Sequence, residues 1–207
     1  MARRTGSSNR WRQRQQRDVY VEQANREGWR SRAVFKLQQI QDKERILKAG
    51  MTCVDLGSSP GGWSQLAAKL VGASGQVWSL DLLPMDPIPG VHFLQGDFTA
   101  GSTVAALREL LADRPVDLVM SDMAPNISGN RAMDQPRSMV LIEDALRFAE
   151  EVLKPGGDLL VKVFQGEGVE SFTRAVREQF ATVRVVKPKA SRSESREIYL
   201  LARNYGM

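Results

Sequence analysis

The stretch Asp55-Leu56-Gly57-Ser58-Ser59-Pro60-Gly61-Gly62-Trp63 decides the fold of this chain. It follows an apolar run that begins at Thr52 and leads into an apolar helical pattern, so it predicts a strand, a sharp turn and a helix. Glycines allow the backbone to turn and to approach a ligand closely. In open α/β sheets, ligands bind where such loops leave the carboxyl ends of strands. We therefore expect a ligand site here, with a purely structural turn as the alternative.

Two phosphate-binding loops do not fit this turn. A P-loop places Gly-Lys-Ser/Thr after the turn, whereas here Trp63 follows Gly62. The G-x-G-x-x-G pattern of dinucleotide-binding proteins is also absent, because Gly57 is followed by Ser58-Ser59. We therefore expect neither a P-loop nor a dinucleotide-binding loop.

Acidic residues near the ends of the first strands suggest a different ligand. Asp55 precedes the glycine-rich turn, Asp81 ends the next predicted strand, and Asp97 follows the third. Asp81 would accept hydrogen bonds from two ribose hydroxyls, and Asp97 would accept one from an adenine amino group. This pattern suits a ligand with a ribose and an amino-acid ammonium group.

Strands and helices alternate along the whole sequence. Strands are expected at 52–56, 76–81, 91–95, 116–121, 158–164, 181–187 and 197–203. Helices are expected at 17–27, 31–47, 63–70, 103–112, 137–153 and 169–180, the fifth ending at the turn Lys154-Pro155-Gly156-Gly157. This order predicts a doubly wound, Rossmann-like α/β fold with a mostly parallel seven-stranded sheet. No helix separates the last two strands, so we expect a C-terminal antiparallel hairpin.

The composition is that of one globular domain. The chain has 207 residues, 42% of them hydrophobic. No apolar run approaches the roughly 18 residues needed to span a bilayer, and no hydrophobic segment follows the basic N-terminus as in a secretory signal. The lone Cys53 and the lone His92 exclude a disulfide framework and are too few for a His/Cys metal site. We expect a monomeric, cytoplasmic protein without a metal.

Positive charge is concentrated at the N-terminus. Residues 1–36 hold ten Lys/Arg and three acidic residues, a net charge of +7, whereas the rest of the chain has a net charge of −2. Arginines interleaved with aromatic residues bind phosphates and stack on bases. We expect RNA contacts from Arg10, Arg12, Arg14, Arg30, Arg32, Lys187, Lys189 and Arg192. The alternative is a solubilising tail. Residues 1–16 are expected to be a basic tail and residues 17–207 a single domain.

Four charged residues lie on or at the ends of predicted elements: Lys36, Asp122, Lys162 and Glu197. Lys162 interrupts an apolar strand, where a buried lysine is costly unless it is paired or functional. Asp122 ends a second apolar strand, Glu197 begins the last strand, and Lys36 is expected near the middle of the helix over 31–47. The four form a candidate catalytic site. A buried salt-bridge network without a catalytic role is the alternative.

Three separate motifs carry a resemblance to a known family. They are Asp55-Leu56-Gly57-Ser58-Ser59-Pro60-Gly61-Gly62-Trp63-Ser64-Gln65, Ser121-Asp122-Met123-Ala124-Pro125-Asn126 and Leu160-Val161-Lys162-Val163-Phe164-Gln165-Gly166. From about Tyr20 to Ala202, the sequence resembles the FtsJ family of ribose 2'-O-methyltransferases. Within that family it is similar to the bacterial members that methylate a uridine of large-subunit (23S) ribosomal RNA.

The resemblance implies a cofactor, a catalytic tetrad and a partner. The cofactor is S-adenosyl-L-methionine, with contacts implied at Gly61, Trp63, Asp81, Asp97 and Asp122 besides Asp55, Gly57 and Gly62 of the loop. The tetrad is Lys36, Asp122, Lys162 and Glu197. The partner is ribosomal RNA, in the large subunit. Enzymes acting on transfer RNA and on messenger caps share this tetrad, so those substrates stay open. A non-catalytic ribosome-assembly factor and a small-molecule methyltransferase are further alternatives.

Lys162 is the expected proton acceptor. A ribose 2'-hydroxyl must lose its proton as it attacks the methyl group, and a neutral amine would accept it. Free lysine titrates near ~10.4, and burial and the charge of Lys36 favour the neutral form, whereas Asp122 and Glu197 oppose it. Alternatively, Lys162 is a cation that stabilises the developing alkoxide. The motif Asp122-Met123-Ala124-Pro125 lacks the aromatic residue of the Asn/Asp-Pro-Pro-Tyr motif in amino-methylating enzymes, which favours a hydroxyl as the acceptor.

Overall fold

The computed structural model describes residues 18–192 and 194–207, so the predicted basic tail over 1–16 lies outside the described residues. The strands are β1 (Thr52–Leu56), β2 (Gln76–Asp81), β3 (Val91–Gln95), β4 (Val116–Ser121), β5 (Leu153–Phe164), β6 (Phe180–Val186) and β7 (Glu197–Tyr205). The helices are α2 (Val19–Glu27), α3 (Val34–Glu44), α4 (Gly62–Val71), α5 (Gly101–Leu111), α6 (Arg131–Val152) and α7 (Val169–Gln179).

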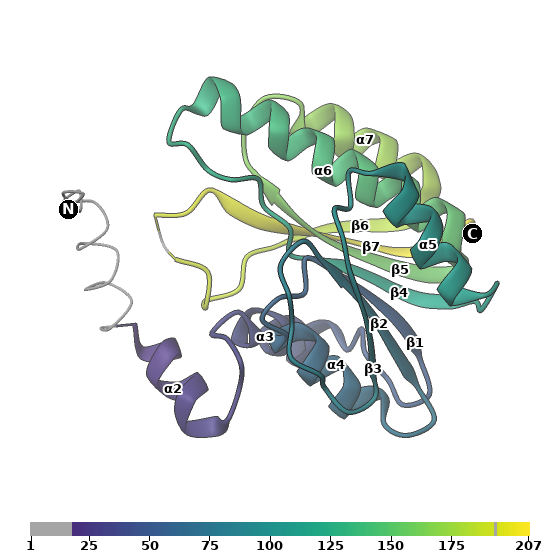
Figure 1. Ribbon diagram of the computed structural model, residues 1–207. Helices are drawn as coiled ribbons and strands as arrows, with labels where there is room; N and C mark the ends of the chain where they lie inside the picture. The colour runs from purple at the N-terminus through teal and green to yellow at the C-terminus, as the bar shows by residue number, and fades with distance from the viewer. Residues whose placement is uncertain (1–17, 193) are drawn as a thin grey trace.

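All the strands belong to one seven-stranded sheet with the order β3-β2-β1-β4-β5-β7-β6 (Figure 1). Neighbouring strands from β3 to β5 run parallel, whereas β7 runs antiparallel to both β5 and β6. The predicted α/β fold with a C-terminal antiparallel hairpin is therefore confirmed. The strand order reverses between β1 and β4, and this switch point is where open α/β sheets bind ligands.

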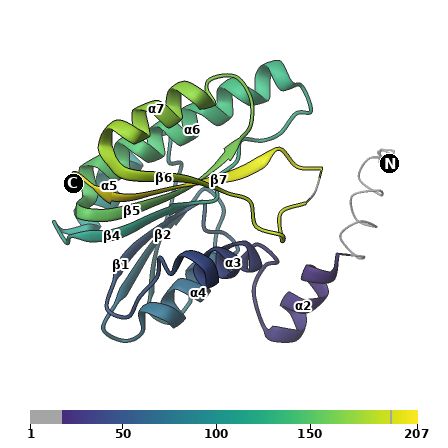
Figure 2. The ribbon, with the colours of Figure 1, turned by 180° about the vertical axis from the view of Figure 1, so that it is seen from behind.

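Alternating strand side chains separate two apolar layers. Val54 of β1 and Val119 of β4 pack with α5, α6 and α7, whereas Cys53 and Leu118 pack with α3 and α4. Figures 1 and 2 show α6 and α7 covering one face of the sheet, with α3 and α4 on the other. Because strand side chains alternate between faces, polar residues that continue the second row at the strand ends point toward α3 and α4.

The structure corrects two expected boundaries near Pro residues. β5 begins at Leu153, which pairs with Val116, rather than at residue 158. The expected turn over 154–157 is instead an irregularity inside the strand, where the register with β4 shifts. Helix α6 begins at Arg131 rather than at residue 137, because the Asn130 side chain accepts a hydrogen bond from Ala132 N and caps the helix before Pro136.

Helix α3 is shorter than expected. It spans Val34–Glu44 and ends where Arg45 adopts a left-handed conformation with φ of 50°. Lys36 therefore lies in the first turn of the helix, and its expected place near the middle was wrong. Within residues 18–192 and 194–207, no helix combines the length and apolar character needed to cross a membrane.

Candidate active site

The glycine-rich loop after β1 packs closely against the loop after β4. Gly57 has φ of 78°, and a Cβ atom at this position would lie 2.6 Å from Met123 Cγ. Its N–H donates to Leu80 O at 2.9 Å, which ties the loop to the end of β2. Only glycine combines this backbone conformation with this close approach. The loop is thereby fixed at the switch point of the sheet.

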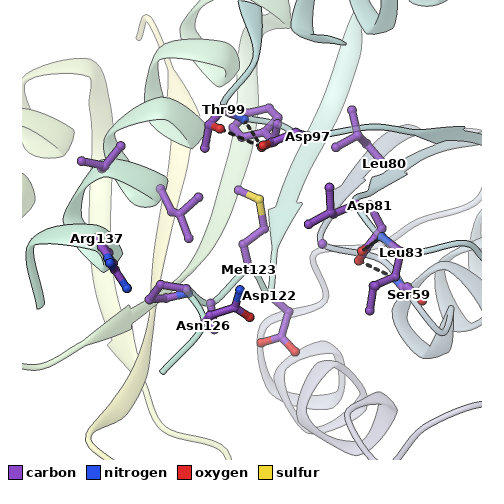
Figure 3. A pocket seen from close by; sticks show the side chains of 17 residues that line it. Ser59, Leu80, Asp81, Leu83, Asp97, Thr99, Asp122, Met123, Asn126 and Arg137 are labelled. Atoms are coloured by element: carbon purple, nitrogen blue, oxygen red, sulfur yellow. Dashed lines mark hydrogen bonds between the residues drawn. The ribbon is translucent and has the colours of Figure 1, made fainter. Parts of the chain in front are cut away.

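A pocket of about 710 Å³ opens between this loop and the loops after β2, β3 and β4. Figure 3 shows Ser59 and Asp81 on one wall and Asn126 and Arg137 on the opposite wall, with Met123 between them. Among the predicted cofactor residues, those that line this pocket are Gly57, Asp81, Asp97 and Asp122. The pocket lies at the carboxyl ends of the strands, where the glycine-rich sequence predicts a ligand site.

Hydrogen bonds hold two carboxylates that line the pocket, those of Asp81 and Asp97. Asp81 Oδ2 accepts a hydrogen bond from Ser59 N and Oδ1 accepts one from Leu83 N, each at 2.8 Å. Asp97 Oδ1 accepts from Thr99 Oγ1 at 2.7 Å and from Thr99 N at 2.9 Å. Hydrogen bonds from the Thr99 side chain and backbone lower the pKa of Asp97. Both carboxylates are therefore held in fixed orientations. Carboxylate oxygens can accept hydrogen bonds from ribose hydroxyls and from an adenine amino group.

The other predicted cofactor residues do not line this pocket. They are Asp55, Gly61, Gly62 and Trp63. Trp63 is buried, its Nε1 donates to Ala33 O at 2.8 Å, and a Cβ atom on Gly62 would lie 2.4 Å from Ser31 Oγ. Gly62 and Trp63 therefore pack the start of α4 against the segment that precedes α3.

Asp55 is fully buried beneath the loop. Ser64 Oγ donates to its Oδ2 at 2.6 Å, whereas its Oδ1 has no hydrogen-bond partner among the described residues. Burial raises the pKa of Asp55 to about 7, although the hydrogen bond from Ser64 opposes this shift. Asp55 therefore helps to order the start of α4, where Ser64 lies.

The four candidate catalytic residues come together beside the pocket. Lys36 Nζ lies 2.6 Å from Glu197 Oε1 and 4.0 Å from Asp122 Oδ1, and Lys162 Nζ lies 3.1 Å from the same Asp122 oxygen. Lys162 also donates to Asp122 O. Burial disfavours the Asp122 carboxylate, but the charges of Lys162 and then Lys36 outweigh burial and lower its pKa. Asp122 is therefore an anion shared by two lysines.

The pattern of the sheet explains why these residues meet. Met120 and Leu160 face the layer of α3 and α4, so Asp122 and Lys162, two residues further along each strand, continue the same rows. Lys162 pairs with Tyr199 in the β5–β7 register, which places β7 beside it. Helix α3 packs on this face and supplies Lys36.

Sequence reasoning overlooked two hydroxyl groups in the cluster. Tyr199 Oη donates to Asp122 Oδ1 at 2.7 Å, and Ser191 Oγ donates to Glu197 Oε1 at 2.8 Å. Tyr199 has 0% exposure and Ser191 6%. Tyr199 lies two residues after Glu197 on a strand, so the strand period of two was the signal that could have placed both side chains on one face. No sequence signal identified Ser191, because it lies on the loop between β6 and β7.

Two of the predicted RNA-contacting arginines hold other parts of the protein. Arg30 donates to Asp86 O at 2.6 Å and to Pro87 O at 2.7 Å. Arg32 pairs with Asp18 and donates to Ala190 O.

The remaining predicted RNA contacts differ in exposure. Lys189 is exposed, Lys187 is exposed and donates to Ser195 O at 2.9 Å, and Arg192 lies 3.9 Å from Asp18. Arg10, Arg12 and Arg14 lie outside the described residues. The β6–β7 loop thus presents positive charge close to Glu197.

Comparisons with known proteins point to one methyltransferase family. Residues 29–205 match the FtsJ-like methyltransferase family. The chain is 55% identical to ribosomal RNA large subunit methyltransferase E of Alkalilimnicola ehrlichii over 205 residues, 99% of this chain and 98% of that protein. A provisionally assigned ribosomal RNA methyltransferase from Plasmodium falciparum is 30% identical with a TM-score of 0.77, over 86% of this chain and 98% of that one. A provisionally assigned Streptococcus mutans methyltransferase, solved with SAH, is 14% identical with a TM-score of 0.52, over 77% and 90% of the two chains, and shares only the fold.

Proposed function

The chain belongs to the FtsJ-like methyltransferase family, and from this premise we propose that it methylates the 2'-hydroxyl of a ribose in large-subunit ribosomal RNA, using S-adenosyl-L-methionine. We propose a uridine as the acceptor nucleotide. The RNA substrate follows from the relative that is 55% identical over almost the whole chain. We further propose that the protein acts as a monomer in the cytoplasm.

One observation carries the proposal: Asp122 belongs both to the pocket and to the charged cluster. It lines the pocket, and its Oδ1 lies 3.1 Å from Lys162 Nζ and 4.0 Å from Lys36 Nζ. A methyl donor in the pocket and a hydroxyl beside Lys162 would therefore be neighbours. Such alignment of two reactants supplies up to ~7–11 kcal/mol of catalysis.

The pocket fits the proposed cofactor. Its volume of about 710 Å³ lies within the ~300–1,000 Å³ of typical ligand sites. Asp81 and Asp97 would hold the ribose hydroxyls and the adenine amino group, with Leu83 and Phe98 offering apolar contacts. When bound, S-adenosyl-L-methionine supplies an electrophilic methyl group on a sulfonium.

Lys162 is the proposed proton acceptor. Lys162 Nζ would accept the proton of the 2'-hydroxyl as that oxygen takes the methyl group and the sulfur keeps the electron pair of the broken bond. Asp122 would orient the neutral Lys162 amine and Glu197 would orient the Lys36 ammonium group, which would add positive charge near the attacking oxygen. The products would be a methyl ether and a neutral thioether, with the hydroxyl proton on Lys162.

Methyl transfer to ribosomal particles tests the function. Tritium from labelled S-adenosyl-L-methionine is expected in large-subunit RNA with the wild-type protein, and digestion of that RNA is expected to place it on one 2'-O-methyluridine. Lys162→Ala is expected to bind the cofactor normally and to lose transfer by at least ~100-fold. Label in transfer RNA or in capped RNA alone would reject the ribosomal substrate. RNA binding without any transfer would support the non-catalytic alternative.

A further inference from the structure

Each acidic residue of the cluster holds a hydroxyl group as well as a lysine. Asp122 Oδ1 accepts a hydrogen bond from Tyr199 Oη at 2.7 Å and lies 3.1 Å from Lys162 Nζ. Glu197 Oε1 accepts from Ser191 Oγ at 2.8 Å and lies 2.6 Å from Lys36 Nζ. In both cases a single carboxylate oxygen contacts a hydroxyl donor and a lysine amine.

The Tyr199 side chain is held in place by the residues packed around its ring. The Tyr199 ring lies 5.7 Å from the Trp63 ring, and it has 0% exposure. Burial, followed by the charges of Asp122 and Glu197, raises the pKa of Tyr199 well above its ordinary value. Its hydroxyl therefore stays protonated and remains a donor at physiological pH.

The loop that carries Ser191 is also anchored. Ser191 N donates to Pro188 O at 3.0 Å, and the N–H of Ala190 donates to Gln39 Oε1 of α3 at 3.0 Å. Ser191 itself is 6% exposed. Its hydroxyl thus lies in a fixed place relative to α3, the helix that supplies Lys36.

We propose that Tyr199 and Ser191 are positioning residues for methyl transfer, Tyr199 by orienting Asp122 for Lys162 and Ser191 by orienting Glu197 for Lys36. The proposal rests on the proposed function and names two groups beyond the Lys-Asp-Lys-Glu tetrad. Neither hydroxyl needs to touch RNA or cofactor, because each acts through a carboxylate.

The hydrogen bond from the Tyr199 hydroxyl to Asp122 affects how strongly Asp122 attracts the Lys162 ammonium group. A carboxylate oxygen that already accepts a hydrogen bond offers less negative charge to a nearby ammonium group. Without that hydroxyl, Asp122 would hold the proton on Lys162 more strongly.

Several other charged side chains surround the Tyr199 hydroxyl and Asp122. Lys36 comes from α3, Glu197 from β7 and Arg32 from the segment before α3, and the buried Asp55 of β1 also interacts electrostatically with Asp122. None of them changes in the variants below, so a shift in pH dependence reports on the hydroxyl.

The test is the pH dependence of kcat for matched hydroxyl deletions. Tyr199→Phe keeps the ring and is expected to lower kcat by about 10- to 100-fold, with the rising limb of the profile displaced to higher pH. The KM for S-adenosyl-L-methionine is expected to stay within about twofold of wild type. Tyr205→Phe is the control. Tyr205 lies on β7 like Tyr199, but its hydroxyl donates to Glu150 O of α6 at 3.0 Å, away from the cluster.

Ser191 provides an independent arm. Ser191→Ala is expected to lower kcat by about 10-fold, and Ser191→Thr, which keeps a hydroxyl, is expected to restore it. If Tyr199→Phe does not fold, as judged by thermal melting, the Ser191 pair decides the proposal alone.

The outcomes separate this proposal from the proposed function. An active wild type with unchanged kcat and pH profile in Tyr199→Phe and Ser191→Ala would overturn only the role of the hydroxyls. The role of the hydroxyls would also be overturned if Tyr199→Phe lowered kcat without displacing the pH profile and if Ser191→Thr did not restore the kcat lost in Ser191→Ala. A wild type without methyl transfer would overturn both.

Discussion

Lys162 is almost fully buried on β5, with its ammonium group 3.1 Å from Asp122 Oδ1 and 5.8 Å from the centre of the Phe164 ring. A proton acceptor must be present as a neutral amine, whereas a group that stabilises an alkoxide must be charged. These two roles require opposite protonation states of the same side chain. A substitution that keeps the charge but cannot lose its proton distinguishes them.

Lys162→Arg is that substitution, because arginine stays protonated in proteins. We expect loss of methyl transfer comparable to that of Lys162→Ala, at least ~100-fold, with cofactor binding retained. Single-turnover transfer and calorimetric cofactor binding measure the two properties. Activity within about 10-fold of wild type in Lys162→Arg would reject proton transfer and favour the cationic role.

Asp55 makes the stability of the protein depend on pH. Burial raises its folded-state pKa to about 7, above the unfolded value, so folding favours the protonated form. Its contribution to stability is fully present below about pH 4 and is lost as the pH rises toward 7. Asp55→Asn removes this ionisation, and relative to it the wild type is expected to lose on the order of 4 kcal/mol across that window. Urea unfolding of both proteins from pH 4 to 8 measures the difference, which a pH-independent offset would contradict.

Arg32 connects the segment before α3 to the β6–β7 loop. Arg32 pairs with Asp18 at the start of α2 and donates to Ala190 O, close to Ser191. The Arg32 and Asp18 side chains are 16% and 13% exposed. Partly buried pairs of this kind are costly to break, because one charge is left without a partner.

Asp18→Asn tests this connection, because asparagine can still cap α2 through Tyr20 N. We expect a loss of about 1–3 kcal/mol in the free energy of unfolding, and faster hydrogen exchange over residues 187–192. Glu151→Gln is the matched control, since it breaks an exposed pair with Arg108 and should cost less than about 1 kcal/mol. Equal effects of both variants would show that the connection is not structural.

The glycine-rich loop offers a second test at this scale. Gly57→Ala would place a Cβ atom 2.6 Å from Met123 Cγ, at φ of +78°. We expect cofactor affinity to fall by more than about 10-fold, because the loop after β4 must move. Gly206→Ala is the control, with φ of +66° and no atom within 4 Å, so it carries the backbone strain without the contact. Unchanged affinity in Gly57→Ala would mean that this packing does not shape the pocket.

The charge of the whole molecule is divided between a basic N-terminal segment and a nearly neutral remainder. Residues 1–36 have a net charge of +7, whereas the whole chain has +5. Cations that neutralise RNA phosphates release counterions, so binding weakens with salt.

Deletion of residues 1–16 removes Arg3, Arg4, Arg10, Arg12 and Arg14. We expect weaker RNA binding and a log–log salt slope smaller by up to about 4, with cofactor binding unchanged. Replacing the same arginines with lysine keeps the charge and should leave the slope nearly as it was. Salt titrations of RNA binding provide the measurement. Methyl transfer to RNA that survives the deletion unchanged would count against a role for this segment.

The sequence alone determined the order of strands and helices, the glycine-rich turn after β1 and the four charged residues. Local features carry that information: apolar periodicity, glycine positions and the cost of a lysine in an apolar strand. The boundaries expected near Pro155 and Pro136 were wrong, because pairing with β4 and the cap at Asn130 decided where β5 and α6 begin.

Only the tertiary structure decided how the side chains are used. Arg30 and Arg32 hold backbone carbonyls of distant loops, and Trp63 packs away from the pocket. Tyr199 joins the charged cluster through a hydrogen bond to Asp122, far away in the sequence, and Ser191 joins it through a hydrogen bond from the β6–β7 loop to Glu197. Periodicity describes which face a residue occupies, whereas the partner of a hydroxyl or guanidinium depends on distances between elements that only packing sets.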